Sequence, residues 1–320
     1  LTNDQQATRV ATSAATDHVR WAPVATFVVV ACALAWLIVL PAWISGEGLQ
    51  HPLIGVMLTA MMVTPAVSMV VTMLIWRAPS SERLRFLGIW PLRPAPRIIL
   101  MLVIGLLVPV VVVGVAVLLS GALGLVSLDL VGLSGYHATL AQSVPPGTVL
   151  PPAGVLLAAQ LVSIPIGALT NSVFAAGEEL GWRGWLLPSL RPLGTWPALL
   201  ITGVVWGLWH SPVILLGYNF GRPDLLGVAL MVGGCIAWGI LFGWLRLRSG
   251  SVWPAVLAHG SLNAVGALVF LLIAAGAVPD MGIVGPLGVV SWAVLAVVAV
   301  ILAVAGQFRR QPPLAPERTR

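Results

Sequence analysis

Long apolar stretches separated by short polar segments run through most of this chain. Each stretch has about 20 residues or more, the length that an α-helix needs to cross a hydrocarbon core of ~30 Å. The pattern predicts an all-α polytopic membrane protein with about eight transmembrane helices. The predicted spans are residues 23–44, 53–76, 98–120, 153–180, 196–217, 225–245, 252–275 and 282–306.

These spans leave polar segments at both ends of the chain and one long loop between spans. Residues 23–306 are expected to form a single transmembrane helical domain, with polar cytoplasmic tails at 1–22 and 307–320. The segment 121–152 is the longest loop predicted on the external side, and its sequence indicates no function.

The composition also indicates a membrane protein. Hydrophobic residues make up 59% of the 320 positions and charged residues only 8%, far from the range of soluble domains. The net charge is +6, and every lysine-or-arginine position is an arginine. These arginines lie in short loops between apolar spans, which favours contact with membrane lipids and gives no indication of nucleic-acid binding. We expect an integral, multi-pass protein of a bacterial plasma membrane.

The arginines alternate from loop to loop. The segment 77–97 carries five of them, and others follow the fourth, sixth and eighth predicted spans. The alternate loops contain only Arg222. Because cytoplasmic loops carry an excess of Lys and Arg, this alternation predicts that both termini and the 77–97 loop are cytoplasmic.

The most polar feature of the spans follows the apolar run from Gly154 to Ala176. Two adjacent carboxylates, Glu178 and Glu179, stand there, and a charged side chain at the centre of a membrane helix costs about 3 kcal/mol on insertion scales. Glu179 and Arg183 are four residues apart, so they can pair on one helix face. Glu178 points elsewhere and lacks that partner, which suggests a separate role. The alternative is a solvated charge cluster at the helix end.

The helical pattern of this stretch continues to Leu190, beyond the length that one span requires. We expect its end to emerge at the cytoplasmic interface, where Trp182 and Trp185 would be favoured. Gly177 and Gly181 would let neighbouring helices approach closely.

Two further spans carry polar side chains at membrane depth. His210 lies in the fifth span, with Trp206 one turn earlier on the same face, where it could pack on the imidazole. His259 and Asn263 lie four residues apart on one face of the seventh span. A lone histidine could bond a backbone carbonyl, and an asparagine could join two helices. Polar groups on three spans are better explained by one shared cavity.

Together these segments resemble the CPBP family of intramembrane proteases, which includes CAAX prenyl proteases of the Rce1 type and bacterial Abi-like relatives. The family pattern is Glu-Glu-x-x-x-Arg, then an aromatic residue (usually Phe) followed by x-x-x-His, then His-x-x-x-Asn. The matching positions are Glu178, Glu179 and Arg183, then Trp206 and His210, then His259 and Asn263. The resemblance covers a catalytic core at about 150–270 and departs from the pattern only where Trp206 replaces Phe.

Peptide hydrolysis needs an activated water, a proton donor for the leaving amine and a stabilised oxyanion. Glu178 is the candidate base, with His210 sharing the activation of the water. His259 and Asn263 suit an oxyanion hole, and the resemblance implies the same roles. The pair of Glu179 and Arg183 is expected to support the site by locking the helix, with Trp206 as a further supporting residue.

Other functions remain open from the sequence. Glu178, His210 and His259 could bind zinc in a metalloprotease, although no His-Glu-x-x-His segment is present, so no cofactor is the favoured prediction. A non-catalytic scaffold or bacteriocin immunity protein is a different class, and a proton-coupled transporter would need repeats that the chain lacks. The favoured substrate is a protein or peptide, and whether it is lipidated stays open.

Overall fold

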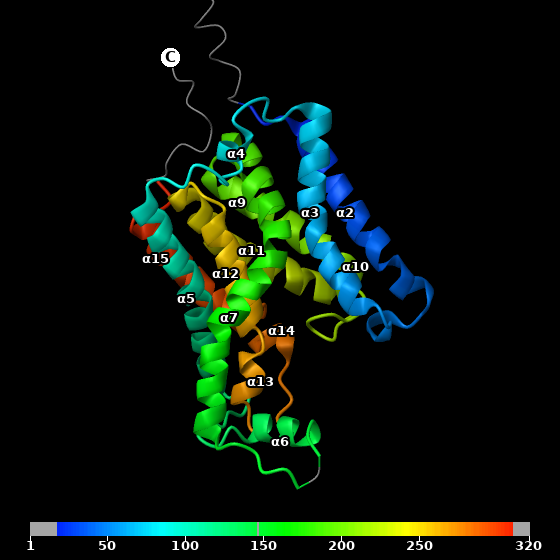
Figure 1. The fold of residues 1–320 in the computed structure, drawn as a ribbon, viewed down its shortest axis with the longest axis vertical. Helices are drawn as coiled ribbons and strands as arrows, with labels where there is room; N and C mark the ends of the chain where they lie inside the picture. Colours follow the sequence, from blue (N-terminus) through cyan, green and yellow to red (C-terminus); the bar gives the residue numbers. More distant parts are fainter. Residues whose placement is uncertain (1–17, 146, 310–320) are drawn as a thin grey trace, which may run out of the picture.

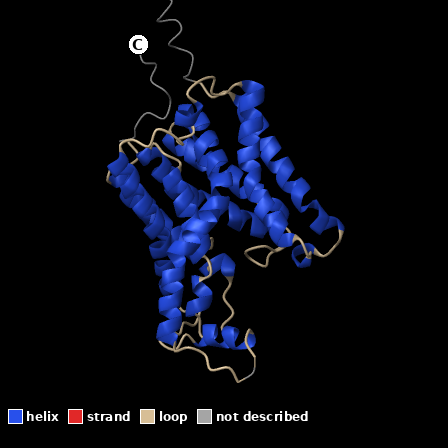
Figure 2. Cartoon of the chain, in the orientation of Figure 1, coloured by secondary structure: helices blue, strands red, loops and turns tan. Residues whose placement is uncertain are grey.

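The structure of the protein is a computed structural model that describes residues 18–145 and 147–309. All regular structure in these two ranges is helical (Figure 2), apart from one isolated bridge between Leu128 and Ile273. The predicted all-α fold class is therefore confirmed. Most of the two predicted tails, residues 1–17 and 310–320, lies outside the described residues.

The main helices cross the molecule side by side (Figure 1). They are α2 (Trp21–Ile44), α3 (Ile54–Trp76), α5 (Ala95–Ala122), α7 (Ala153–Glu179), α9 (Thr195–Trp209), α11 (Leu225–Ser249), α12 (Trp253–Val265) and α15 (Val289–Val304). Short elements connect them. These are η1 (Gly48–Gln50), α4 (Arg83–Phe86), α6 (Ser134–Gln142), η2 (Leu180–Leu186), α8 (Leu187–Leu190), η3 (Arg191–Leu193), α10 (Ser211–Ile214), α13 (Leu268–Leu272) and α14 (Met281–Val284).

Seven helical segments of the described chain are long and apolar enough to cross a membrane, and they overlap seven of the predicted spans. The remaining predicted span, 196–217, is instead the 15-residue helix α9 followed by the single turn α10. Pro212 explains the break, because its ring cannot continue a preceding helix but suits the first turn of a new one. The protein is an integral, multi-pass membrane protein.

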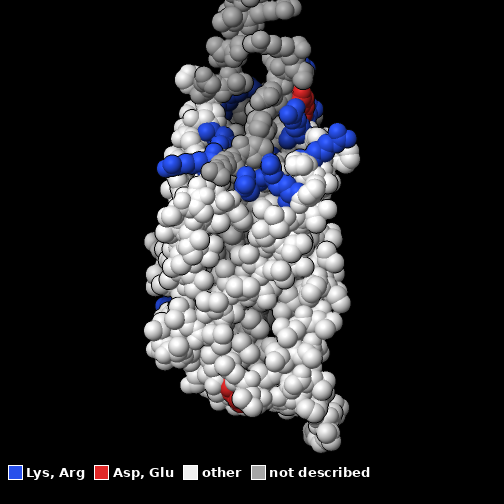
Figure 3. Space-filling view, turned by 90° about the vertical axis from the view of Figure 1, so that its left-hand side faces the viewer, with Lys and Arg blue, Asp and Glu red and all other residues white. Residues whose placement is uncertain are grey.

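On the face shown in Figure 3, most charged side chains gather at one end, above a broad band with few charges. Helix α4 lies at this end of the bundle and α6 at the opposite end (Figure 1). A band of this kind suits the lipid-facing surface of a membrane protein. The cytoplasmic orientation of the charged end, and of both termini, stays a prediction.

Helix α7 runs directly into the seven-residue π-helix η2 and then α8, so that helical structure is nearly continuous from 153 to 193. Close packing against α3 holds this junction. A Cβ atom added to Gly177 would lie 2.6 Å from the carbonyl oxygen of Met62, and one on Gly181 would lie 2.5 Å from Cβ of Pro65. The predicted role of these glycines in close helix approach is confirmed.

The expected position of Trp182 and Trp185 at the membrane interface stays a prediction, but neither indole is exposed to lipid or water. Their exposed fractions are 0% and 1%, and both rings pack on Phe27 of α2, with centroid distances of 5.4 and 5.0 Å. Because α2 and α3 cover η2, the end of the long helix lies in the protein core. Helix α12 lies between α7 and α5, and α11 packs along α9.

Candidate active site

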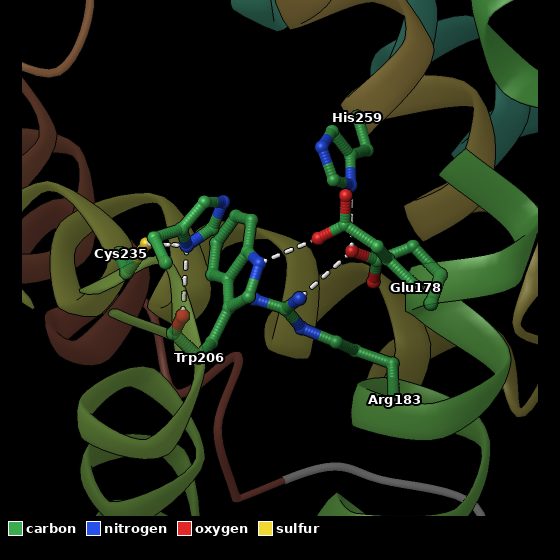
Figure 4. A network of polar contacts seen from close by, with 7 residues as sticks. Glu178, Arg183, Trp206, Cys235 and His259 are labelled. Carbon is green, nitrogen blue, oxygen red and sulfur yellow. Dashed lines mark hydrogen bonds and ion pairs between the residues drawn. The ribbon is translucent and has the colours of Figure 1, made fainter. Parts of the chain in front are cut away.

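Glu178 lies on the last turn of α7, directly before the π-helix, and is only 2% exposed. Its Oε2 atom accepts a hydrogen bond of 2.7 Å from the indole Nε1 of Trp206 on α9 (Figure 4). A buried carboxylate requires such donors, since water is not available to solvate it. Glu178 therefore has a fixed partner that the sequence analysis did not anticipate.

Glu179 is fully buried and joins two other helical elements. Its Oε1 atom accepts hydrogen bonds from Nη1 of Arg183 at 2.8 Å and from Nδ1 of His259 at 2.9 Å. Its Oε2 atom has no hydrogen-bond partner among the described residues. The expected pair of Glu179 and Arg183 is present, and the alternative of a solvated charge cluster is wrong because both glutamates are buried.

Arg183 belongs to η2 and is 1% exposed. Its guanidinium carbon lies 4.4 Å from the ring centroid of Trp206 and 5.4 Å from that of Phe242. Cation–π contacts of this kind gain strength when the cation is desolvated. The guanidinium thus has the Glu179 carboxylate on one side and aromatic faces on the other, which keeps a buried positive charge in one position.

His210 terminates α9 and is half-buried. Its Nδ1 atom lies 2.8 Å from the carbonyl oxygen of Trp206 and 3.9 Å from Sγ of Cys235. A carbonyl oxygen can only accept, so Nδ1 of His210 carries the proton in this hydrogen bond. In the neutral ring Nε2 is then unprotonated and can accept a proton.

His259 on α12 is hydrogen-bonded through its Nδ1 atom, as His210 is. A carboxylate oxygen of Glu179 accepts from its Nδ1 atom, so Nδ1 also carries a proton here. The ring centroid of His259 lies 5.6 Å from that of Phe242 in a stacked arrangement. The carboxylate and the aromatic ring together fix the orientation of this imidazole, with Nε2 left for another partner.

Trp206 connects the histidines with the carboxylates. Its ring centroid lies 5.9 Å from that of His210 and 5.3 Å from that of His259, while its N–H group is bonded to Glu178. The expected packing of Trp206 beside His210 is present. The hydrogen bond to Glu178 was missed, although a polar N–H in place of the usual Phe was a signal that could have indicated it.

A cavity of about 740 Å³ opens beside this network. Its lining includes all four residues expected to be catalytic, which are Glu178 from α7, His210 at the end of α9, and His259 and Asn263 from α12. Asn263 is exposed in this wall. The structure thus brings together side chains from three segments of the chain, as the sequence predicted.

The cavity also contains residues that the sequence analysis did not select. Asn171 lines it from α7, two turns before Glu178 on the same face. Its amide donates to the carbonyl of Gly167 at 2.8 Å. Much of the remaining wall is apolar and includes the methionines Met61, Met62, Met231 and Met281. The spacing of Asn171 from Glu178 was the signal that could have identified it.

The zinc alternative depends on which donor atoms of the site are available. In the part of the chain that the structure describes, no group of three or more His, Cys, Asp or Glu side chains is arranged to hold a metal ion. One oxygen of Glu178 is bonded to an indole, and each histidine uses Nδ1 in a contact with another group. Oε1 of Glu178 and Nε2 of each histidine are left for another partner, and zinc-bound histidines commonly donate their other ring N–H in this way. The absence of a metal cofactor therefore stays a prediction.

Comparisons with known proteins agree with the resemblance. A family model described as type II CAAX prenyl endopeptidase Rce1-like matches residues 158–265, which contain all three motifs. CAAX prenyl protease 2 of Methanococcus maripaludis is 26% identical over 150 residues, covering 38% of this chain and 55% of that protein. The chain thus spans about half the length of this curated relative. The predicted similarity to the CPBP or Rce1 type is confirmed.

Proposed function

From the Rce1-type similarity of residues 158–265, we propose that this protein is an intramembrane endopeptidase that hydrolyses a peptide bond. The observation that carries the proposal is the cavity wall formed by Glu178, His210, His259 and Asn263. These side chains are a base, a second proton acceptor and potential oxyanion donors around one space large enough for a peptide segment. Peptide hydrolysis uses this set of groups.

Water activation is assigned to Glu178 and His210. The indole of Trp206 donates to Oε2 of Glu178, which leaves Oε1 to accept a hydrogen bond from the attacking water. Nε2 of neutral His210 can accept a hydrogen bond from the same water. As the water oxygen attacks the peptide carbonyl carbon, Glu178 takes one proton, and the protonated carboxyl later transfers it to the leaving amine nitrogen.

Oxyanion stabilisation is assigned to Asn263 and His259. The side-chain amide of Asn263 can donate to the oxygen that becomes negative in the tetrahedral intermediate. Nε2 of His259 can donate only in the imidazolium form, because Nδ1 already donates to Glu179. The carboxylate of Glu179 stabilises that form by its charge, which gives Glu179 a role in orienting His259 beside its pairing with Arg183.

The proposed substrate is a protein or peptide that reaches the cavity from the membrane. Several cavity-lining residues are apolar and flexible, including Met61, Met62, Met231 and Met281, and methionine adapts to irregular apolar ligands. These residues support a lipidated peptide as the preferred substrate. The arginine distribution supports an orientation with the charged end of the protein in the cytoplasm.

The proposal is tested by cleavage of a quenched fluorescent peptide with the protein purified in detergent, using prenylated and unprenylated forms of the same peptide. Glu178→Gln should abolish cleavage, because an amide cannot accept the proton of the water. The control is Glu82→Gln, which changes a surface glutamate paired with Arg85 and should leave the rate unchanged. Wild-type activity that survives in Glu178→Gln would overturn the assignment, and equal rates on both peptides would overturn the lipid preference.

A further inference from the structure

A second buried arginine lies outside the network described above. Arg246 is the fourth residue from the end of α11 and is 0% exposed. It forms no ion pair with any carboxylate in the described ranges. A buried charge of this kind is costly unless hydrogen bonds compensate it. Its hydrogen-bond partners therefore show which segments of the structure Arg246 stabilises.

Arg246 donates to the backbone of two separate segments. Its Nε atom lies 3.1 Å from the carbonyl oxygen of Arg183 in η2, and Nη2 lies 2.7 Å from the carbonyl oxygen of Phe86 at the end of α4. Its Nη1 atom has no partner among the described residues. One guanidinium thus joins α11, the α4 segment and the π-helix that follows Glu179.

The hydrogen bond from Arg246 to the carbonyl of Arg183 in the π-helix indicates what Arg246 does. Where hydrogen bonding changes from i→i+5 to i→i+4, the backbone register shifts and a carbonyl group can lose its N–H donor. Arg183 lies in the middle of η2, whose backbone runs from Leu180 to Leu186. A side-chain donor at the carbonyl of Arg183 stabilises this irregular turn, because buried carbonyl groups need a partner.

The surroundings of Arg246 are shaped to receive its guanidinium. Gly88 has φ +73°, and a Cβ atom there would lie 2.6 Å from Cζ of Arg246. The carbonyl of Gly88 accepts hydrogen bonds from the backbone N–H of Val252 at 3.0 Å and from Oγ of Ser251 at 3.1 Å. The segment around Gly88 is thereby fixed to the α11–α12 connection, and its lack of a side chain leaves space for the arginine.

We propose that Arg246 is a positioning residue for the peptidase reaction, an inference that rests on the function proposed above. The hydrogen bond from Arg246 to the carbonyl of Arg183 stabilises the backbone conformation of η2. From that backbone the Arg183 side chain reaches Glu179. Glu179 in turn orients His259. Arg246 thus acts on catalysis through the backbone of η2 without touching the substrate.

The test compares Arg246→Lys with a matched control on the same helix. Lysine keeps the positive charge but cannot donate to both carbonyls in the fixed geometry of a guanidinium. We expect kcat to fall about tenfold or more with KM within about twofold of wild type, since small displacements of catalytic groups act on the reaction step. The control is Arg248→Gln, which should leave kcat unchanged. Nε of Arg248 donates to the side chain of Gln307 and not to η2.

A double-mutant cycle separates positioning from a general loss of stability. If Arg246 acts through Glu179, Arg246→Lys should lower the residual kcat of Glu179→Gln less than twofold, because coupled residues give non-additive effects. Gly88→Ala places a Cβ atom 2.6 Å from Cζ of Arg246 and 2.9 Å from the backbone nitrogen of Val252. It displaces the guanidinium together with the contact between the segment around Gly88 and Val252, and it should reproduce the loss of kcat without changing Arg246.

The outcomes distinguish the two proposals. Wild-type kcat in both Arg246→Lys and Gly88→Ala, or full additivity with Glu179→Gln, would overturn the positioning role while leaving the peptidase proposal intact. Absence of any Glu178-dependent cleavage by the wild-type protein would overturn the peptidase proposal and, with it, this inference.

Discussion

The indole N–H of Trp206 donates a hydrogen bond of 2.7 Å to Oε2 of Glu178, so that a side chain on α9 holds one oxygen of the proposed base on α7. The family pattern usually has Phe at this position, and Phe cannot make this bond. The same indole lies beside both histidines and beneath the guanidinium of Arg183. Trp206 therefore couples the orientation of the base to the rest of the site.

Replacement of this indole gives the first prediction. Trp206→Phe should keep the aromatic packing but leave Oε2 of Glu178 without its donor, which costs about 1–3 kcal/mol of folding free energy. We expect kcat to fall about tenfold, because the carboxylate loses its fixed orientation. Steady-state cleavage kinetics and thermal unfolding in detergent measure the two effects.

Trp185→Phe is the control for that variant. Trp185 is 1% exposed and does not line the cavity, and its N–H donates to the carbonyl oxygen of Ala78 at 2.8 Å. It should lose a comparable amount of stability with little change in kcat. Equal loss of kcat in both variants would show that the Trp206 effect is a general packing effect.

The second prediction concerns the fully buried carboxylate. Glu179→Gln retains an oxygen that can accept hydrogen bonds from Arg183 and His259, but it leaves the Arg183 charge without a counter-charge. Removing one partner of a buried ion pair typically costs about 3–5 kcal/mol. We expect a large drop in the unfolding temperature and a lower kcat. Glu82→Gln at the exposed pair with Arg85 should change stability by less than about 1 kcal/mol. Unfolding temperatures that match in the two variants would refute the structural role of Glu179.

The third prediction tests the oxyanion assignment. Asn263→Ala should lower kcat about 100-fold or more with little change in KM, because the lost hydrogen bond forms mainly in the transition state. Asn171→Ala is the comparison, since Asn171 lines the same cavity but donates to the carbonyl of Gly167. It should retain most of the wild-type kcat. A rise in KM without loss of kcat in Asn263→Ala would assign Asn263 to substrate binding instead.

The fourth prediction concerns orientation in the membrane. A cysteine at the exposed position Ser81, in the arginine-rich 77–97 segment, should be shielded from an impermeant thiol reagent in intact cells. A cysteine at the exposed position Gln50, in an arginine-free loop, should react. Cys32 and Cys235 are replaced in both proteins to remove background labelling. The reverse labelling pattern would invert the predicted topology.

The sequence predicted those parts of the site that depend on local spacing. The contact of Glu179 with Arg183 follows from a separation of four residues, and the shared face of His259 and Asn263 follows from the same rule. Seven of the predicted spans follow from apolar length alone. These relationships require no knowledge of how the helices are arranged.

Other features depend on contacts between distant segments. The burial of Trp182 and Trp185 results from the packing of α2 and α3 over η2, and periodicity cannot report that packing. The π-helix itself has no characteristic period over seven residues. The hydrogen bond from Trp206 to Glu178 and the contact of Arg246 with the Arg183 carbonyl join different helices, so both became visible only in three dimensions.

The central claim is that a carboxylate, and not a metal ion, activates the water. The Nδ1 contacts of His210 and His259 with a carbonyl and a carboxylate are also contacts that zinc-bound histidines make, so the question needs a direct measurement. The protein is purified in detergent, dialysed against a strong chelator, and assayed for metal content and for cleavage of the same peptide. We predict that cleavage continues at the undialysed rate in metal-free protein and is lost only in Glu178→Gln. Stoichiometric zinc whose removal abolishes cleavage and whose return restores it would contradict the glutamate mechanism.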